Sequence, residues 1–292
     1  MPYLTVGKEN FGKIDLYYED HGSGDPVVLI HGWPLSGASW EKQTAVLLEG
    51  GYRVITYDRR GFGRSAQPAS GYDYDTFAED LDRIMTALDL RNATLAGFSM
   101  GGGEVARYLS TFGPRRVRGA AFISAIPPFL LRTADNPAGV DGSIFDGIRQ
   151  GIVGDRPRFL MQFFHNFYNV DLLGDTRISD EAVRLSWNTG TAASPKATLD
   201  CVSAWLTDFR NDLAKIRVPS LIVHGDADRI VPFEASGKRT HAAIEGSRLV
   251  VVEGGPHGLN WTHAAELNRA RLDFLAAPAA KKAGRSRTAA KA

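Results

Sequence analysis

Six short apolar runs rich in β-branched residues recur along the chain and constrain its fold more than any other feature. The runs lie at 26–30, 52–57, 93–98, 117–124, 219–225 and 248–254. Short runs that are apolar throughout are typical of parallel strands buried on both faces. Segments with helical spacing separate several of them. This alternation of strand and helix predicts an α/β fold whose sheet is doubly wound and mostly parallel.

The segment before the third run has the spacing of an amphipathic helix. Its apolar residues are Phe77, Leu81, Ile84, Met85 and Leu88. Thr76 and Glu79 stand three residues apart, as the two partners of an N-terminal capping box do. We therefore predict that this helix is capped at Thr76.

The alternation stops after Ile126, and the next segment is rich in aromatic residues but contains no clear strand. We predict that residues 127–214 form a helical cap inserted into a core made of residues 1–126 and 215–277. Core and cap are expected to be one domain unit, because an α/β chain of 292 residues commonly is. The basic tail at 278–292 has no apolar spacing and is predicted to be disordered.

The overall charge and the cysteine content exclude several classes of function. The formal net charge is +1, which gives no general attraction to nucleic acid or to an anionic membrane, so the expected partner is a small molecule. Cys201 is the only cysteine, which excludes an internal disulfide and a cysteine-based zinc site and fits a reducing compartment. The N-terminal stretch lacks the features of a secretory signal, and no run of about 18 apolar residues occurs. We expect a cytoplasmic protein.

The stretch LAGFSMGGGE, residues 95–104, places one serine, Ser99, between Gly97 and Gly101 at the end of a predicted strand. Helical sequence follows it directly. A sharp turn from strand to helix needs glycines on both sides of the serine, because other side chains would collide there. Such a turn exposes the hydroxyl at the N-terminus of the helix. The pattern predicts that Ser99 is the nucleophile of a nucleophile elbow.

A serine hydroxyl needs a base to take its proton, and one of the seven histidines must supply it. His257 lies in EGGPHGLNW, a loop rich in glycine and proline that follows the last predicted strand. An imidazole there can reach across the carboxyl edge of the sheet, so we predict His257 as the base. His263 starts the last helix and is predicted to be a solvated helix residue.

The carboxylate that orients the base is expected in LIVHGDADRIVPFE, where a strand ends in a turn. Asp226 directly follows the strand and Gly225, so it is expected to satisfy backbone donors of the turn. Asp228 projects further, and we predict it as the partner of His257. The chain order serine, aspartate, histidine differs from the orders of chymotrypsin and subtilisin.

An acyl-transfer site also needs N–H donors for the oxygen of its tetrahedral intermediate, and HGWP, residues 31–34, follows a central predicted strand. We predict that the backbone N–H groups of Trp33 and Met100 form this oxyanion hole. His31 is expected to be a hydrogen-bonded structural residue and not a catalyst. No metal is predicted, because acidic stretches such as DYDTFAED lack the spacing of a ligand set.

Five motifs together give the sequence a resemblance to a known family. They are HGWP, YDRRGFGRS, GFSMGGGE, HGDADRIVP and GGPHGLN, within residues 26–275. With these motifs and the order serine, aspartate, histidine, the chain resembles the cofactor-free bacterial haloperoxidases and aryl esterases of the α/β-hydrolase family. The resemblance implies the α/β-hydrolase fold, no cofactor, the site roles assigned above, and cleavage of small aryl or alkyl esters through an acyl-enzyme. It also implies that hydrogen peroxide can replace water and give a peracid, which oxidises halide.

The resemblance further implies residues of a substrate pocket. It assigns Phe163, Phe167 and Ile230 to that pocket. Pro34 follows the oxyanion residue Trp33, and proline at this place goes with the perhydrolase and haloperoxidase members of the family. The implied partners are a small ester or carboxylic acid, hydrogen peroxide, and further copies of the chain, since family members often self-associate.

Two other functions remain open on the sequence. Carbon–carbon bond hydrolases of the same fold keep a serine triad and differ in the cap, which the sequence defines least. A small-molecule receptor that keeps the triad but turns over slowly would carry the same motifs. Haloalkane dehalogenases and epoxide hydrolases use an aspartate nucleophile, so Ser99 argues against both.

Overall fold

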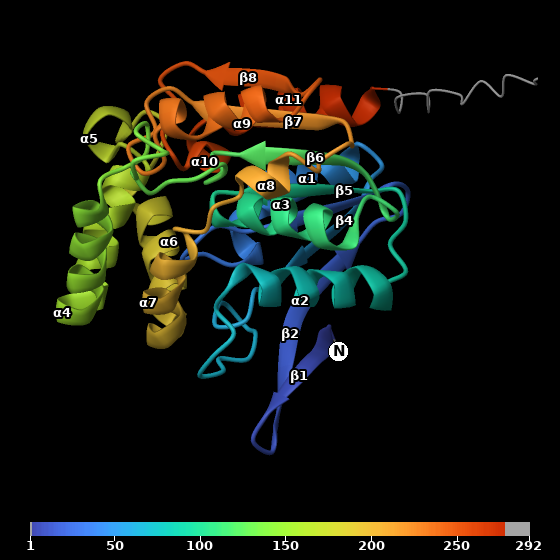
Figure 1. Ribbon diagram of the computed structural model, residues 1–292, viewed down its shortest axis with the longest axis horizontal. Coiled ribbons are helices and arrows are strands. Elements are labelled where there is room, and N and C mark those ends of the chain that lie inside the picture. The colour runs from blue at the N-terminus through green and yellow to red at the C-terminus, as the bar shows by residue number, and fades with distance from the viewer. Residues whose placement is uncertain (1, 278–292) are drawn as a thin grey trace, which may run out of the picture.

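An eight-stranded sheet lies at the centre of the computed structural model, which describes residues 2–277 (Figure 1). The strand order in the sheet is β1-β2-β4-β3-β5-β6-β7-β8. The strands are β1 (Tyr3–Glu9), β2 (Gly12–His21), β3 (Pro26–Ile30), β4 (Arg53–Tyr57), β5 (Ala93–Phe98), β6 (Val117–Ile123), β7 (Ser220–Gly225) and β8 (Arg248–Val252). Met1 and the tail predicted for 278–292 lie outside the described residues.

All six predicted strands are present and pair in parallel, which confirms the α/β fold with a mostly parallel, doubly wound sheet. β3, β5 and β7 are buried at every residue, so other elements cover both faces of the sheet there. The sequence analysis missed the antiparallel hairpin of β1 and β2, which pairs with β4. Only Val6, Ile14 and Leu16 of this hairpin are buried, so its strands lack a continuous apolar run.

Helices connect the parallel strands and pack in pairs. Those outside the cap segment are α1 (Glu41–Glu49), α2 (Tyr74–Ala87), α3 (Met100–Phe112), α9 (Gly237–Ala243), α10 (Leu259–Thr262) and α11 (Ala264–Ala276), with the 3-10 turns η1 (Gly37–Trp40) and η2 (Phe233–Ala235). α2 packs against α3, and α1 packs against α11. Within residues 2–277, no helix combines the length and the apolar character needed to cross a membrane.

Five helices lie between β6 and β7, in the segment predicted as a cap. They are α4 (Gly142–Phe167), α5 (Val170–Leu173), α6 (Asp180–Ala192), α7 (Pro195–Ala204) and α8 (Arg210–Leu213). α4 packs against α6 and α7, and the three helices stand together at the left of Figure 1. α4 is kinked at Asp155, just before Pro157. Its second half carries Phe163, which packs against Trp33 and so joins the cap to the loop after β3.

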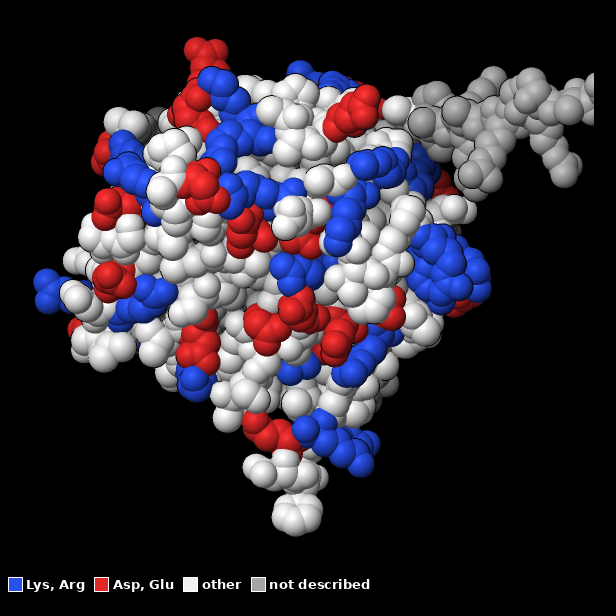
Figure 2. All heavy atoms as spheres, viewed as in Figure 1, with Lys and Arg blue, Asp and Glu red and all other residues white. Residues whose placement is uncertain are grey.

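Charged side chains of both signs are mixed over the face of the molecule drawn in Figure 2. Lys and Arg lie next to Asp and Glu across this face. Among the described residues, Arg107 forms an ion pair with Asp212 at 3.1 Å. The mixture agrees with the formal net charge of +1 for the whole sequence.

Helix α2 is capped by Asp73 and not by Thr76, so the predicted capping box was wrong. One carboxylate oxygen of Asp73 accepts the Thr76 N–H at 2.9 Å, and the other accepts the Thr76 hydroxyl at 2.9 Å. An aspartate at this position satisfies a free N–H and also adds negative charge at the positive end of the helix dipole. Glu79 lies inside the helix, where it faces Arg83 at 4.0 Å.

This capping arrangement predicts that Asp73→Ala lowers the free energy of unfolding by about 1 kcal/mol, because the first turn of α2 loses its acceptor. Glu79→Ala is the matched control and should change it by less than about 0.5 kcal/mol, since its side chain is exposed. Urea unfolding of the two variants measures the difference. If Glu79→Ala lowered the free energy of unfolding more than Asp73→Ala, the result would contradict capping by Asp73.

Candidate active site

The chain turns sharply from β5 into α3 at Ser99, whose backbone has φ 53° and ψ −118°. A positive φ is strained for a residue with a side chain and is typical of nucleophile elbows. The turn is tight because a Cβ at Gly97 would lie 2.3 Å from the Gly101 carbonyl oxygen. A Cβ at Gly101 would lie 2.4 Å from the carbonyl oxygen of Ile30 in β3. Both positions therefore exclude every residue except glycine.

The structure brings together the three side chains that the sequence analysis selected. His257 Nε2 lies 2.8 Å from Ser99 Oγ, and His257 Nδ1 lies 2.8 Å from Asp228 Oδ2. All three residues are buried, and His257 is only 1% exposed. This geometry can move a proton from the serine hydroxyl to the imidazole, while the carboxylate holds the other ring nitrogen.

Backbone donors and a second histidine fix the carboxylate of Asp228. Its Oδ1 accepts the N–H groups of Ile230 at 2.9 Å and Val231 at 2.8 Å. His224 Nε2 lies 2.9 Å from the Val231 carbonyl oxygen and 3.3 Å from Oδ2, so the two acceptors share its N–H. Burial alone would raise the pKa of Asp228, but the charge of His257 and the hydrogen bonds from both histidines outweigh it and hold that pKa well below its usual value. The group therefore stays an acceptor for the imidazole.

The two residues that the sequence analysis set aside lie elsewhere. Asp226 is exposed, and its carboxylate accepts the Gly254 N–H at 2.7 Å. It therefore links the turn after β7 to the turn after β8. His263 is buried and not solvated as predicted, because it sits at the junction of α10 and α11. Its Nδ1 lies 2.9 Å from the Thr262 hydroxyl.

The loop after β3 packs directly against the serine. A Cβ at Gly32 would lie 2.9 Å from Ser99 Cβ, so the backbone of this loop touches the elbow. Among residues 2–277, no acceptor is bonded to the N–H of Trp33 or to the N–H of Met100. Both residues are buried, at 2% and 0% exposure. Two free backbone donors beside a serine hydroxyl are what an oxyanion hole requires.

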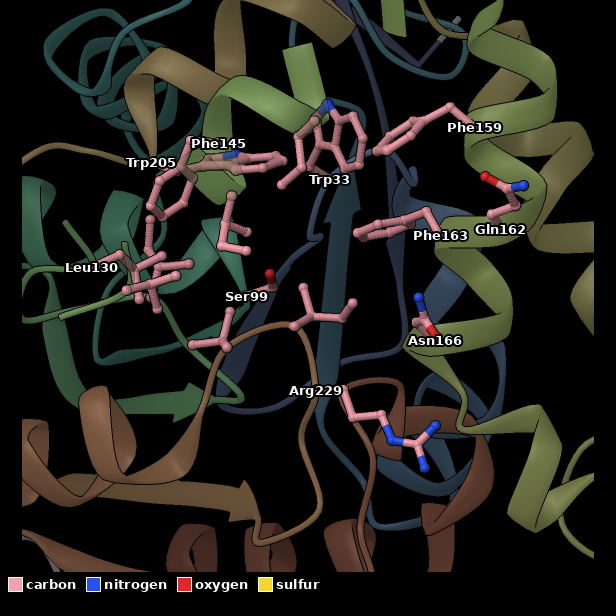
Figure 3. Close-up of a pocket in the computed structure, with 16 residues that line it drawn as sticks. Trp33, Ser99, Leu130, Phe145, Phe159, Gln162, Phe163, Asn166, Trp205 and Arg229 are labelled. Atoms are coloured by element: carbon pink, nitrogen blue, oxygen red, sulfur yellow. The ribbon is translucent and has the colours of Figure 1, made fainter. Parts of the chain in front are cut away.

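A cavity of about 290 Å³ opens above Ser99 (Figure 3). Its other lining residues are Trp33, Ile126, Leu130, Val140, Ile144, Phe145, Ile148, Phe159, Gln162, Phe163, Asn166, Trp205, Arg229, Ile230 and Val231. Aliphatic and aromatic side chains dominate the walls. Gln162 and Asn166 project from α4 on the side away from Leu130, as Figure 3 shows. The cavity is therefore suited to an apolar group whose reacting carbon sits at the serine.

Two of the four predicted pocket residues, Phe163 and Ile230, line this cavity, and two do not. Phe167 is fully buried and packs edge-to-face on the imidazole of His257, with the ring centroids 5.0 Å apart. This contact restricts the movement of the imidazole. Pro34 faces α6, where a Cβ on Gly190 would lie 3.0 Å from its Cγ. Neither side chain is therefore part of the pocket wall in the described structure.

Sequence reasoning left part of the cavity unassigned. Ile126 and Leu130 follow the end of β6, in the stretch AIPPFLL, which has no helical or strand periodicity. Phe145 lies in the first half of α4. The one signal for Ile126 was its place just beyond a strand that neighbours β5, because carboxyl ends of parallel strands meet at one edge.

No group of three or more His, Cys, Asp or Glu residues is placed to hold a metal ion within residues 2–277. Cys201 is buried, and burial raises the pKa of its thiol to about 12. The polar groups next to the serine are the imidazole, the carboxylate and the two free N–H groups, and Gln162, Asn166 and Arg229 add polar side chains to the cavity wall.

Comparisons with known proteins agree with this geometry. The sequence profile of the alpha/beta hydrolase fold matches residues 25–264. A Synechocystis protein provisionally named a non-heme chloroperoxidase is 60% identical over 94% of this chain and 100% of its own length. The crystal structure of a bromoperoxidase from Bacillus anthracis has 51% identity and a TM-score of 0.90, over 94% of this chain and 98% of that one. A bifunctional esterase/perhydrolase from Acinetobacter calcoaceticus is 37% identical, over 90% and 96% of the two chains.

Proposed function

The chain belongs to the α/β-hydrolase family, and we propose that it cleaves small carboxylic esters through an acyl-enzyme and also accepts hydrogen peroxide as a second nucleophile. One observation carries the proposal: the hydroxyl, imidazole and carboxylate of Ser99, His257 and Asp228 are in hydrogen-bond contact below an apolar cavity. The names of the haloperoxidase and esterase/perhydrolase relatives support the same chemistry.

The first half of the reaction forms the acyl-enzyme. Ser99 Oγ attacks the ester carbonyl carbon, and its proton passes to Nε2 of His257, 2.8 Å away. Negative charge develops on the carbonyl oxygen, where the N–H groups of Trp33 and Met100 can stabilise it. The intermediate then collapses. The bond to the alcohol oxygen breaks, and the alcohol leaves with the proton held by His257.

The second half releases the acyl group and sets the outcome. His257 takes a proton from water or from hydrogen peroxide, and the resulting oxygen nucleophile attacks the acyl carbon. Water gives the carboxylic acid, and peroxide gives the peracid. Ser99 regains its proton from His257 in either case. The peracid then oxidises a halide ion to hypohalous acid outside the site and becomes the carboxylic acid, so halogenation needs no cofactor.

The cavity limits the substrate class. Its volume of about 290 Å³ lies just below the usual range of ligand pockets, about 300 to 1,000 Å³. The aromatic rings of Phe145, Phe159 and Phe163 form much of its wall. We therefore assign small esters with an alkyl or aryl group as substrates, and small molecules as the partners of the site.

Removal of the nucleophile tests the proposal directly. Ser99→Ala should lower kcat for 4-nitrophenyl acetate by about 10⁴-fold or more, because no acyl-enzyme can form. Unfolding by heat should be nearly unchanged, since only one hydroxyl is lost. Steady-state absorbance of released nitrophenol measures the rate. Near-wild-type kcat in this variant would disprove the assignment, and release that stops after one equivalent in the wild type would favour a receptor.

The two aspartates after β7 form a matched pair. Asp228→Asn should lower kcat by about 10³- to 10⁴-fold, because the amide no longer holds the imidazole of His257 in the correct tautomer. Asp226→Asn should keep kcat within about threefold, since this exposed residue only accepts a turn N–H. The same ester assay ranks the two variants. The reverse ranking would transfer the role to Asp226.

Pro34 is expected to bias the choice between water and peroxide. Among residues 2–277, no donor is bonded to the Trp33 carbonyl, so this oxygen is free to accept the extra O–H of hydrogen peroxide. Proline restricts the backbone on both sides of that carbonyl. Pro34→Leu should lower the ratio of perhydrolysis to hydrolysis by about threefold or more and spare ester cleavage. Parallel assays of peracid and acid measure the ratio. Equal losses in both rates, or an unchanged ratio, would show that Pro34 is only structural.

A further inference from the structure

The imidazole of His31 does not belong to the proton relay, yet it contacts the peptide unit that carries a proposed oxyanion donor. His31 Nδ1 lies 2.8 Å from the carbonyl oxygen of Gly32. That carbonyl and the N–H of Trp33 belong to one planar peptide group, so fixing one end fixes the direction of the other. The ring is fully buried.

The surroundings of the ring determine which nitrogen carries the proton. The backbone N–H of Arg59 points at His31 Nε2 over 3.0 Å, and a backbone N–H can only donate. Nε2 must therefore accept, which leaves the proton on Nδ1, where it is donated to the Gly32 carbonyl. Burial and the nearby charge of Arg59 hold the pKa of His31 well below its usual value, so the ring stays neutral.

A buried ion pair ties this histidine to the helix that follows the nucleophile. Arg59 bonds to Glu104 of α3 at 2.7–2.8 Å and donates to the carbonyl oxygen of His31 at 3.0 Å. Tyr57 also donates to Glu104. The side chains of Arg59 and Glu104 are at most 1% exposed, so the contact cannot exchange with water. The loop after β3 and helix α3 are thus held to one another.

The Gly32 carbonyl has a second donor. The N–H of Leu35 lies 3.0 Å from the same oxygen, so the carbonyl accepts two hydrogen bonds on one side of the peptide. Hydrogen bonds to a carbonyl polarise its amide and make the N–H at the other end a stronger donor.

We propose that His31 is a positioning residue of the oxyanion hole, whose Nδ1–H fixes and polarises the Gly32–Trp33 peptide so that the Trp33 N–H faces the developing oxyanion. The inference rests on the proposed function, because it needs an acyl intermediate at Ser99. It assigns a role in the chemical step to a residue that never touches substrate.

Two variants separate the donor at Nδ1 from the acceptor at Nε2. Asparagine carries its amide nitrogen the same number of bonds from Cβ as imidazole carries Nδ1, so His31→Asn can still donate to Gly32. Glutamine matches the position of Nε2, so His31→Gln can accept from Arg59 but loses the donor. Both variants keep one of the two hydrogen bonds, which makes each the stability control of the other.

We expect His31→Gln to have a kcat about tenfold below that of His31→Asn, with similar KM, because one oxyanion donor is weakened and not removed. The infrared band of the acyl carbonyl gives a signature that a structural role would not produce. In the acyl-enzyme formed from a carbonyl-labelled cinnamoyl ester, the band should shift to higher frequency in His31→Gln and stay close to wild type in His31→Asn. Equal kcat and unshifted bands in both variants would overturn the inference.

A measurement on the wild-type protein keeps the inference testable if the variants do not fold. Nitrogen NMR of protein labelled at histidine should show two buried rings protonated at Nδ1 only, at about pH 7: His257 beside Asp228, and His31 beside the Gly32 carbonyl. Spectra in which His257 alone has that tautomer would overturn the inference. A wild-type enzyme that gives no acyl band at all would contradict the proposed function, and this result differs from a band that forms and fails to shift.

Discussion

The site depends on a contact between two stretches of backbone. Where β5 turns into α3, the elbow lies so close to the end of β3 that no side chain fits at Gly97 or Gly101. This contact sets the position of Ser99, and it also brings the loop after β3 against the serine. The close approach of two stretches of main chain therefore sets the position of the nucleophile, and it leaves the backbone few ways to relax.

The carboxylate and the imidazole of the site are also held in place by groups that take no part in the reaction. The carboxylate of Asp228 is held by two backbone N–H groups and one buried histidine in addition to His257. Phe167 packs on the imidazole and restricts its rotation. The carboxylate and the imidazole thus each contact groups that do not react, so they need little reorganisation when charge develops.

Local sequence patterns predicted the relay, and they failed where the structure depends on distant packing. Ser99, Asp228 and His257 each follow a parallel strand in a short loop, so strand positions alone brought them to one edge. The resemblance assigned Phe167 to the pocket, but tertiary packing places its ring against the imidazole of His257. Leu130 had no periodic context at all. The cap of α2 was misplaced because Thr76 and Glu79 match a motif that Asp73 satisfies better.

Trp33 connects the catalytic serine to the helices between β6 and β7. Its backbone faces Ser99, while its indole packs between Phe163 of α4 and Trp205 after α7 and donates to the Thr198 carbonyl at 3.1 Å. Substrate scope and catalytic rate are therefore not independent traits in this scaffold. Substitutions in the helices between β6 and β7 that suit a new acyl group also disturb the packing around Trp33, whose N–H we propose as an oxyanion donor, so the order in which such changes accumulate decides which evolutionary routes stay open.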